Sequence, residues 1–194
     1  IKEQAEVYKS EFGIETKIYS KEEFDKIGHG GTEQFGALSY KPGFAINPLK
    51  FVNGIAKYAL SKKLKIFEHT LVDKIDKINS SYTLRTKEGS VNTKKVVVAT
   101  NGFYQEGLVP QMNSRILPVI SNIIVTRKLT KNEIDLHNFK TFSPIANTKN
   151  LLYYYRKLPD NRILFGTRGD FIGSDQSNLD RSKIMEKFLK DIFP

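Results

Sequence analysis

An uninterrupted apolar run at residues 96–99, VVVA, constrains the fold of this chain more than any other feature. A strand covered on both faces reads as a continuous run of β-branched residues, whereas a half-exposed strand alternates apolar and polar residues. Small residues follow at 100–102, TNG, where the backbone can approach a ligand closely. Ligands of open α/β sheets lie beyond the carboxyl ends of strands. The run therefore predicts a central strand of a larger sheet, with a ligand near its end.

The segments before this run indicate helices mixed with strands. Asn47 is a predicted helix N-cap with Pro48 in the first turn, and apolar residues then recur at helical spacing to near Lys62. Ser20 and Glu23 form a predicted capping box, which begins a shorter helix. The other predicted elements are a helix over 4–12, strands over 14–19, 64–67, 75–78 and 82–86, and a turn at 87–90.

After Gly102 the pattern becomes that of an antiparallel sheet. Strands are predicted over 116–126, 151–156 and 162–167, and Pro-Asp-Asn at 159–161 predicts the hairpin turn between the last two. A terminal amphipathic helix is predicted over 178–192, with Ile184, Phe188 and Ile192 on one face. The fold class predicted from these patterns is α+β (mixed α/β).

Composition argues against several classes of function. The chain of 194 residues has no cysteine and three histidines in different settings, so disulfides, thiolate catalysis and a metal centre are not expected. Its formal net charge is +10, but the lysines are spread along the chain without a nucleic-acid-binding motif, which favours a solvated surface. No apolar run reaches the ~18–20 residues of a membrane span. The N-terminus has no apolar signal-peptide core. The absence of cysteine fits a cytoplasmic location.

Three stretches in series carry a resemblance to a known family. They are INPLKFVNGIAKYALSKKLKIFEHTLVDKI at 46–75, VNTKKVVVATNGFYQEGLVP at 91–110 with RILPVISNIIVTRKL at 115–129, and LLYYYRKLPDNRILFGTR at 151–168. Their order and spacing resemble the FAD-dependent glycine/D-amino-acid oxidase family, in particular gamma-glutamylputrescine oxidase-like members.

The resemblance implies a division of the chain between two domains. Residues 1–42 are expected to begin a substrate domain and its connecting loop. Residues 43–106 are expected to form the middle segment of a partial FAD-binding domain. Residues 107–194 are expected to complete the substrate domain, an antiparallel sheet carrying helices.

The resemblance also implies contacts to FAD. Val72 matches the position whose backbone meets the adenine end of the cofactor. The segment after the apolar run matches one that passes close to FAD, namely Ala99, Thr100, Asn101 and Gly102. Read without the resemblance, Val72 is equally a core residue and Asn101-Gly102 an ordinary tight turn.

The substrate contacts are expected on the predicted strand that contains three tyrosines. Side chains alternate along a strand, so Tyr153 and Tyr155 face one way, whereas Tyr154 and Arg156 face the other. Tyr154 and Arg156 are the predicted substrate-binding pair, because a hydroxyl and a guanidinium suit an amine or a carboxylate. The alternative is aromatic packing beside a surface arginine.

Two departures from the family pattern limit what the resemblance implies. Ala45 and Asn47 replace the two histidines of the Gly-His-x-His-Pro segment of many relatives, so the identity of the substrate does not carry over. The family's Gly-x-Gly-x-x-Gly unit has no match, because Gly28, Gly30 and Gly31 are too close together and follow a helix. We therefore expect the chain by itself to bind FAD poorly. We also expect self-association through an unpaired sheet edge at the apolar run.

For the intact protein the resemblance implies FAD-dependent oxidation of the C–N bond of a small amine or amino acid. A hydride passes from carbon to the flavin, so no catalytic nucleophile or acid–base pair is required, and none is assigned. The final electron acceptor, oxygen or another molecule, is left open. Two alternatives remain: a basic α+β binding module for an anionic partner such as nucleic acid, and a truncated chain without a function of its own.

Overall fold

The computed structural model describes residues 1–150, 152–169 and 174–194, and the chain divides into two compact units. The larger unit combines Ile1–Ala45 with Ile120–Pro194, and the smaller unit is Ile46–Val119. The expected domain boundaries, after residues 42 and 106, lie three and 13 residues before the limits at 45 and 119. The identification of the units with a substrate domain and part of a FAD-binding domain stays a prediction.

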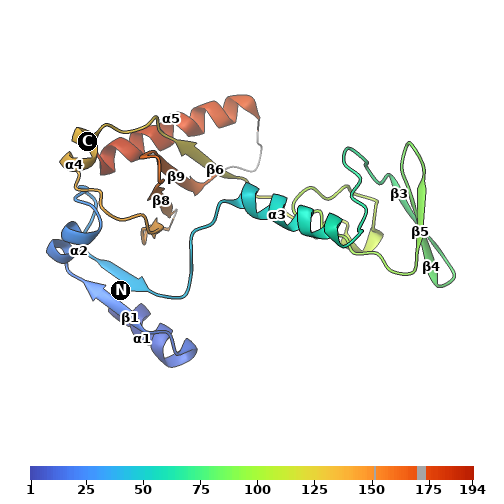
Figure 1. Ribbon diagram of the computed structural model, residues 1–194, viewed down its shortest axis with the longest axis horizontal. Helices are drawn as coiled ribbons and strands as arrows, with labels where there is room; N and C mark the ends of the chain where they lie inside the picture. Colours follow the sequence, from blue (N-terminus) through green and yellow to red (C-terminus); the bar gives the residue numbers. More distant parts are fainter. Residues whose placement is uncertain (151, 170–173) are drawn as a thin grey trace. The chain divides into compact units, whose positions relative to one another are not determined.

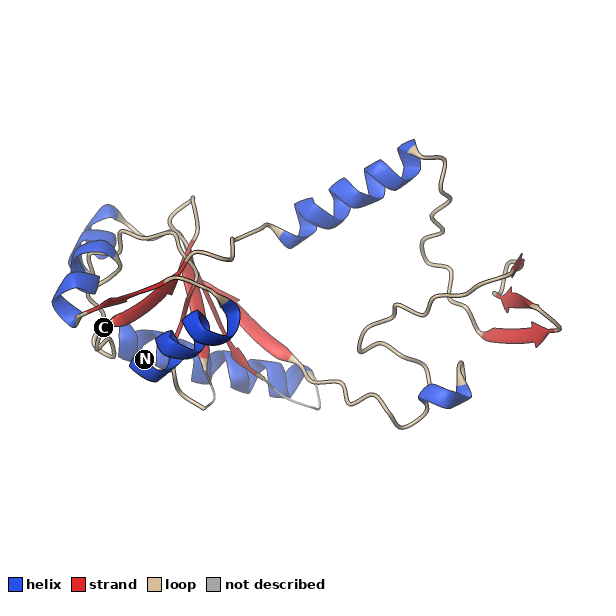
Figure 2. Ribbon diagram, turned by 90° about the horizontal axis from the view of Figure 1, so that it is seen from below, coloured by secondary structure: helices blue, strands red, loops and turns tan. Residues whose placement is uncertain are grey.

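A four-stranded antiparallel sheet, in the order β6-β9-β8-β7, organises the larger unit (Figure 1). Its strands are β6 (Ser121–Val125), β7 (Ile145–Ala146), β8 (Tyr153–Lys157) and β9 (Ile163–Arg168). Helix α5 (Asp175–Ile192) packs along one face of this sheet (Figure 2). Strand β6 is shorter than the predicted 116–126, and the predicted part that includes Pro118, a residue without a ladder donor, is not strand. Leu151, the predicted start of β8, lies outside the described residues.

The core of the larger unit lies between the sheet and α5. Its buried apolar side chains are Phe139, Tyr153, Tyr155, Ile163, Phe165, Met185 and Ile192. Burial alternates along β8, with Tyr153 and Tyr155 buried and Tyr154 and Arg156 half-buried, which confirms the predicted alternation. On α5 the predicted face is wrong at Ile184, which is exposed, because Met185 is the residue that enters the core.

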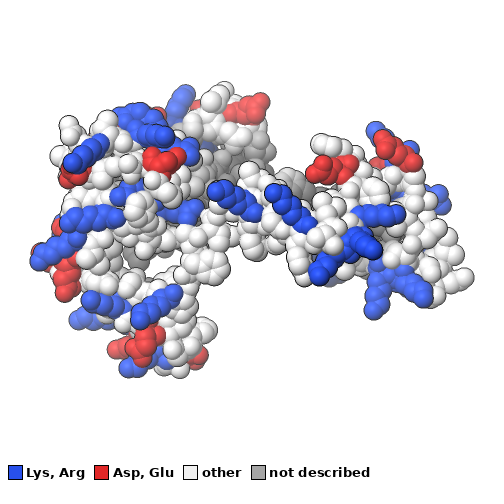
Figure 3. Space-filling view, viewed as in Figure 1, with Lys and Arg blue, Asp and Glu red and all other residues white. Residues whose placement is uncertain are grey.

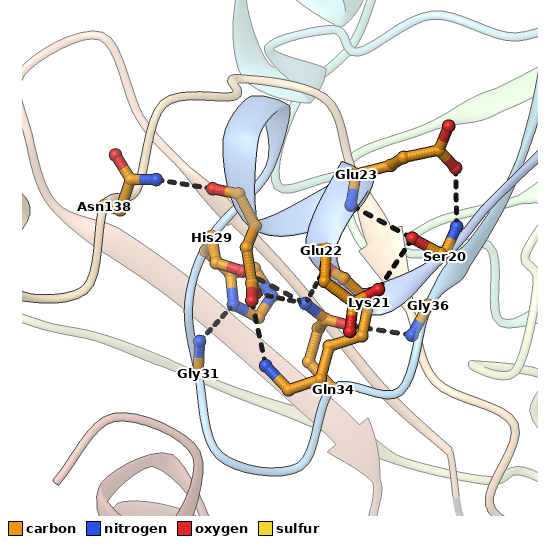
Figure 4. Close-up of polar contacts among 10 residues, drawn as sticks. Ser20, Lys21, Glu22, Glu23, His29, Gly31, Gln34, Gly36 and Asn138 are labelled. Carbon is orange, nitrogen blue, oxygen red and sulfur yellow. Dashed lines mark hydrogen bonds and ion pairs between the residues drawn. The ribbon is translucent and has the colours of Figure 1, made fainter.

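The remaining elements of the larger unit are short. They are α1 (Lys2–Phe12), β1 (Thr16–Tyr19), α2 (Lys21–Ile27), β2 (Ala37–Tyr40) and α4 (Lys131–Leu136), with β1 and β2 paired antiparallel. The predicted capping box of α2 is confirmed: Ser20 Oγ accepts from Glu23 N at 3.2 Å, and Glu23 Oε2 accepts from Ser20 N at 2.8 Å (Figure 4). Strand β2 was not predicted from the sequence.

The smaller unit holds a helix and a three-stranded sheet. Its elements are α3 (Pro48–Ser61), β3 (Lys74–Ile78), β4 (Ser81–Arg85), β5 (Ser90–Thr93) and a 3-10 turn, η1 (Pro110–Met112). The predicted N-cap of α3 is confirmed, since Asn47 Oδ1 accepts from Lys50 N at 3.0 Å. The strands order as β3-β4-β5, all antiparallel.

Two strands predicted in the smaller unit, at 64–67 and 96–99, are wrong for this structure. Neither segment is strand, and Val97 is 87% exposed. A strand is held by hydrogen bonds to a neighbouring strand, and no described segment pairs with either of these. The apolar run therefore predicted burial and pairing that the described chain does not supply.

Candidate functional site

The face of the four-stranded sheet turned away from α5, called the outer face here, carries the predicted substrate-binding pair. In the register of the sheet, Tyr154 lies opposite Gly166 and Arg156 lies opposite Leu164. A hollow of about 210 Å³ is lined by Pro144, Ile145, Tyr154, Tyr155, Arg156 and Leu164. The structure thus brings Tyr154 and Arg156 together at one hollow, while their role in binding substrate stays a prediction.

The hollow combines apolar walls with a small number of polar groups. Pro144, Ile145 and Leu164 contribute apolar surface, and the Arg156 guanidinium contributes hydrogen-bond donors in a planar fork. Tyr154 Oη is hydrogen-bonded to Ser121 Oγ, so its position is set by a second strand. An apolar hollow with a few oriented polar groups is the usual form of a small-molecule site.

The predicted FAD contacts lie in the smaller unit, on turns and loops. Asn101 has a left-handed backbone, φ 53°, and Phe103 N donates to Thr100 O at 3.0 Å, so the predicted tight turn is present. Ala99 and Thr100 are exposed and available to a ligand. A Cβ on Gly102 would come no closer than 3.6 Å to Pro118, so packing inside the chain does not require glycine there.

Val72 lies two residues before the start of β3 and is half-buried. A role of Val72 and residues 99–102 in holding FAD stays a prediction.

The Gly-rich loop before β2 is hydrogen-bonded within the protein and is not arranged to bind phosphate. Its backbone N–H groups already donate within the protein: Gly30 N to His137 O at 2.7 Å, Gly31 N to His29 Nδ1 at 3.0 Å, and Thr32 N to Ile192 O at 3.0 Å. A Cβ on Gly31 would lie 2.8 Å from Ile192 O. The loop therefore closes on the C-terminal end of α5. It does not fit the pyrophosphate of FAD, which needs unpaired N–H groups.

His29 is a buried, hydrogen-bonded histidine whose position the sequence did not predict. It is fully buried, Nδ1 accepts from Gly31 N, and Nε2 lies 2.8 Å from Tyr155 Oη (Figure 4 shows the Gly31 contact). Burial lowers the pKa of His29 from 6.5 to about 4, and burial also raises the pKa of Tyr155. The one sequence signal was the group of glycines around His29, which permits close packing.

On the face shown in Figure 3, lysine and arginine alternate with aspartate and glutamate over the left-hand part. On the right-hand part the acidic side chains lie along the upper side, and basic side chains gather below them. Within 1–150, 152–169 and 174–194, no three His, Asp or Glu side chains gather as a metal site would require. The same residues include no helix with the length and hydropathy needed to cross a membrane.

Comparison with known proteins supplies the context for this geometry. The family model described as FAD dependent oxidoreductase matches residues 1–194. A probable oxidoreductase OrdL from Haemophilus influenzae is 31% identical over 153 residues, 77% of this chain and 34% of the relative. Gamma-glutamylputrescine oxidoreductase from Escherichia coli is 28% identical over 155 residues, 80% of this chain and 36% of the relative.

The fold has a counterpart among solved structures. Glycine oxidase from Geobacillus kaustophilus superposes with a TM-score of 0.64 at 18% identity, covering 100% of this chain and 52% of that protein. This likeness confirms the predicted mixture of helices and antiparallel sheets. The chain spans about a third of the length of the curated relatives that it matches. With the family model matching from the first residue to the last, the predicted family and its cofactor class are confirmed: the chain belongs to the FAD-dependent oxidoreductases.

Proposed function

We propose that the protein containing this chain oxidises the C–N bond of a small amine or amino acid with FAD as its cofactor. The observation that carries the proposal is the pairing of Tyr154 and Arg156 at one hollow on the outer face. Two similar proteins are named for activities on such compounds, gamma-glutamylputrescine oxidoreductase and glycine oxidase. The relatives favour this enzyme over a nucleic-acid-binding module.

The proposed oxidation requires few catalytic side chains from the protein. A hydride leaves the carbon beside nitrogen, the C–N bond becomes an imine, and water hydrolyses the imine to a carbonyl compound and an amine. The cofactor, when bound, supplies the hydride acceptor, so the protein has to orient the substrate and exclude water. Arg156 suits a substrate carboxylate or carbonyl, and Leu164, which lies opposite Arg156, adds apolar surface beside it.

The smaller unit is proposed to contribute backbone contacts to FAD. Val72 would meet the adenine end, and the turn formed by Ala99, Thr100, Asn101 and Gly102 would pass beside the cofactor. The amides of the Gly-rich loop before β2 are already paired within the protein. The pyrophosphate would therefore be held by groups other than that loop.

The test compares two proteins by their absorbance. One is the 194-residue chain, and the other joins it to the nucleotide-binding segment of a family member. After soaking in FAD and desalting, we expect the joined protein to keep flavin bands near ~370 and ~450 nm and the chain by itself to lose them. Anaerobic addition of amines and amino acids should then bleach the ~450 nm band.

Either expectation can fail separately. Retention of about one flavin per chain by the 194-residue protein would show that poor FAD binding was a wrong prediction. A joined protein that folds and keeps FAD, but is bleached by no amine or amino acid, would refute the proposed C–N oxidation.

A further inference from the structure

Tyr154 is held on the outer face by a neighbour on each of two other strands. Gly166 lies opposite it on β9, and a methyl group on Gly166 would overlap the Tyr154 ring. The ring therefore occupies the space above Gly166 that a side chain would fill. It crosses β9 to β6, where Tyr154 Oη is hydrogen-bonded to Ser121 Oγ.

A backbone carbonyl sets the direction of this hydrogen bond. Ser121 Oγ also lies 3.4 Å from Thr167 O, a long hydrogen bond in which the carbonyl can only accept. We assign the one hydroxyl hydrogen of Ser121 to Thr167 O, the assignment that satisfies both contacts. Its oxygen is left to accept the hydrogen of Tyr154. The chain of hydrogen bonds runs from Tyr154 through Ser121 to the backbone of β9.

We propose that Tyr154 Oη is a fixed hydrogen-bond acceptor for the N–H group of the substrate, with Ser121 and Gly166 as its positioning residues. The hydroxyl hydrogen is committed to Ser121, so the remaining lone pair of Oη can bind a donor. An ammonium or amine is such a donor, whereas a carboxylate is not. This inference rests on the proposed function, because it names the part of an amine substrate that Tyr154 recognises.

Arg156 places a complementary group on the same face of the sheet. It follows Tyr154 by two residues on the same face of β8, and residues so spaced are about 7 Å apart along a strand. A guanidinium donates and never accepts, so it recognises an anionic or carbonyl group. The outer face therefore favours compounds with an N–H donor toward Tyr154 and an acceptor or anion toward Arg156.

The experiment titrates the 194-residue chain with two small probes of matched size, propylammonium and propionate. The protein carries 13C-labelled tyrosine rings, and Tyr154→Phe identifies the Tyr154 signal among the nine tyrosines. We expect propylammonium to shift the Tyr154 signal saturably. Propionate should bind Arg156 instead. Arg156→Gln should therefore weaken the binding of propionate and leave the binding of propylammonium unchanged.

Ser121→Ala is the decisive variant, because Ser121 is exposed and its loss leaves the core intact. Without Ser121 the Tyr154 hydroxyl is free to turn its hydrogen toward the ligand. The dissociation constant for propylammonium should then rise about threefold to tenfold, the effect of one hydrogen bond, with that for propionate unchanged. Ser39→Ala, an exposed strand position of the same unit, is the matched control and should change neither.

Gly166→Ala tests the second positioning residue. It should displace the Tyr154 ring and abolish the propylammonium shift, while circular dichroism reports whether the fold is kept. The inference is overturned if propylammonium leaves the Tyr154 signal unmoved, or if Ser121→Ala binds it as tightly as the unsubstituted chain. No flavin takes part, so this result is independent of whether the joined protein oxidises amines.

Discussion

His29 is buried among the rings of Phe24, Phe139, Tyr155 and Phe193, and both of its ring nitrogens are hydrogen-bonded. Because Nδ1 accepts from Gly31 N, the neutral ring carries its hydrogen on Nε2 and donates it to Tyr155 Oη. Charging His29 would place a second hydrogen on Nδ1, against the Gly31 N–H. The buried His29 ring is therefore uncharged in the folded protein.

This burial predicts that the free energy of unfolding falls in mild acid. The folded pKa, about 4, lies below the ordinary 6.5, so the unfolded chain binds more protons between these values and stability rises with pH there. From above pH 6.5 down to about 4 the loss is about 3 kcal/mol, and it levels off below. Urea unfolding across this range measures it.

His29→Gln supplies the control for the pH dependence. Glutamine does not titrate, so the variant should be less stable at neutral pH and should lose the slope between pH 4 and 6.5. An unchanged slope in the variant would show that other groups cause the pH dependence.

Arg156 carries a prediction for the enzyme that contains this chain. Arg156→Gln should raise KM for carboxylate-bearing amines about tenfold to 100-fold, the effect of hydrogen bonds to a charged group, with a smaller change in kcat. The KM for amines without a carboxylate should change least. Arg162→Gln, which removes a partly exposed arginine paired with Asp160, is the control. Equal effects of the two variants would contradict a role of Arg156 in binding.

At the scale of elements, the β8–β9 hairpin depends on a left-handed residue. Asn161 has φ 65°, and its N–H donates to Leu158 O at 3.0 Å. Asn161→Ala should lower the free energy of unfolding by about 1 kcal/mol, since a Cβ without a hydrogen-bonding group is disfavoured in that conformation. Asn161→Gly should be nearly neutral, because glycine adopts it readily. Chemical denaturation of both variants checks this, and equal stabilities would contradict it.

The apolar run at 96–99 shows that strand-forming residues do not make a strand by themselves. Val96 and Val98 are half-buried and Val97 is exposed. Helix α3, in contrast, forms as predicted, because its cap and its i to i−4 hydrogen bonds are local. Local bonds suffice for the helix, whereas the strand requires a neighbour.

At the scale of the whole molecule, burial is uneven between the two units. Each of the buried apolar side chains of the core belongs to the larger unit, whereas α3 exposes Leu49, Phe51, Val52 and Ile55. Amides of β8, β9 and α5 should therefore exchange with deuterium much more slowly than those of α3 and β3. Mass spectrometry of exchanged peptides measures this, and equal protection would contradict it.

Self-association of the chain stays a prediction, but the sheet edge that would mediate it differs from the expected one. The expected edge at 96–99 is not a strand, but β6 and β7 form the two edges of the four-stranded sheet. Sedimentation velocity over a tenfold range of concentration distinguishes a monomer from an associating chain.

The sequence by itself determined the features that depend on a few neighbouring residues. The caps at Ser20 and Asn47, the turn at 159–161 and the alternation along β8 are such features, and the order of three motifs indicated the family. Tertiary structure alone decided that His29 is buried against Tyr155, 126 residues away, and that Tyr154 lies over Gly166 and reaches Ser121. It also decided that residues 96–99 remain unpaired. Caps, turns and side-chain alternation are set by local hydrogen bonds and backbone geometry, whereas burial and strand pairing depend on which distant segments come together.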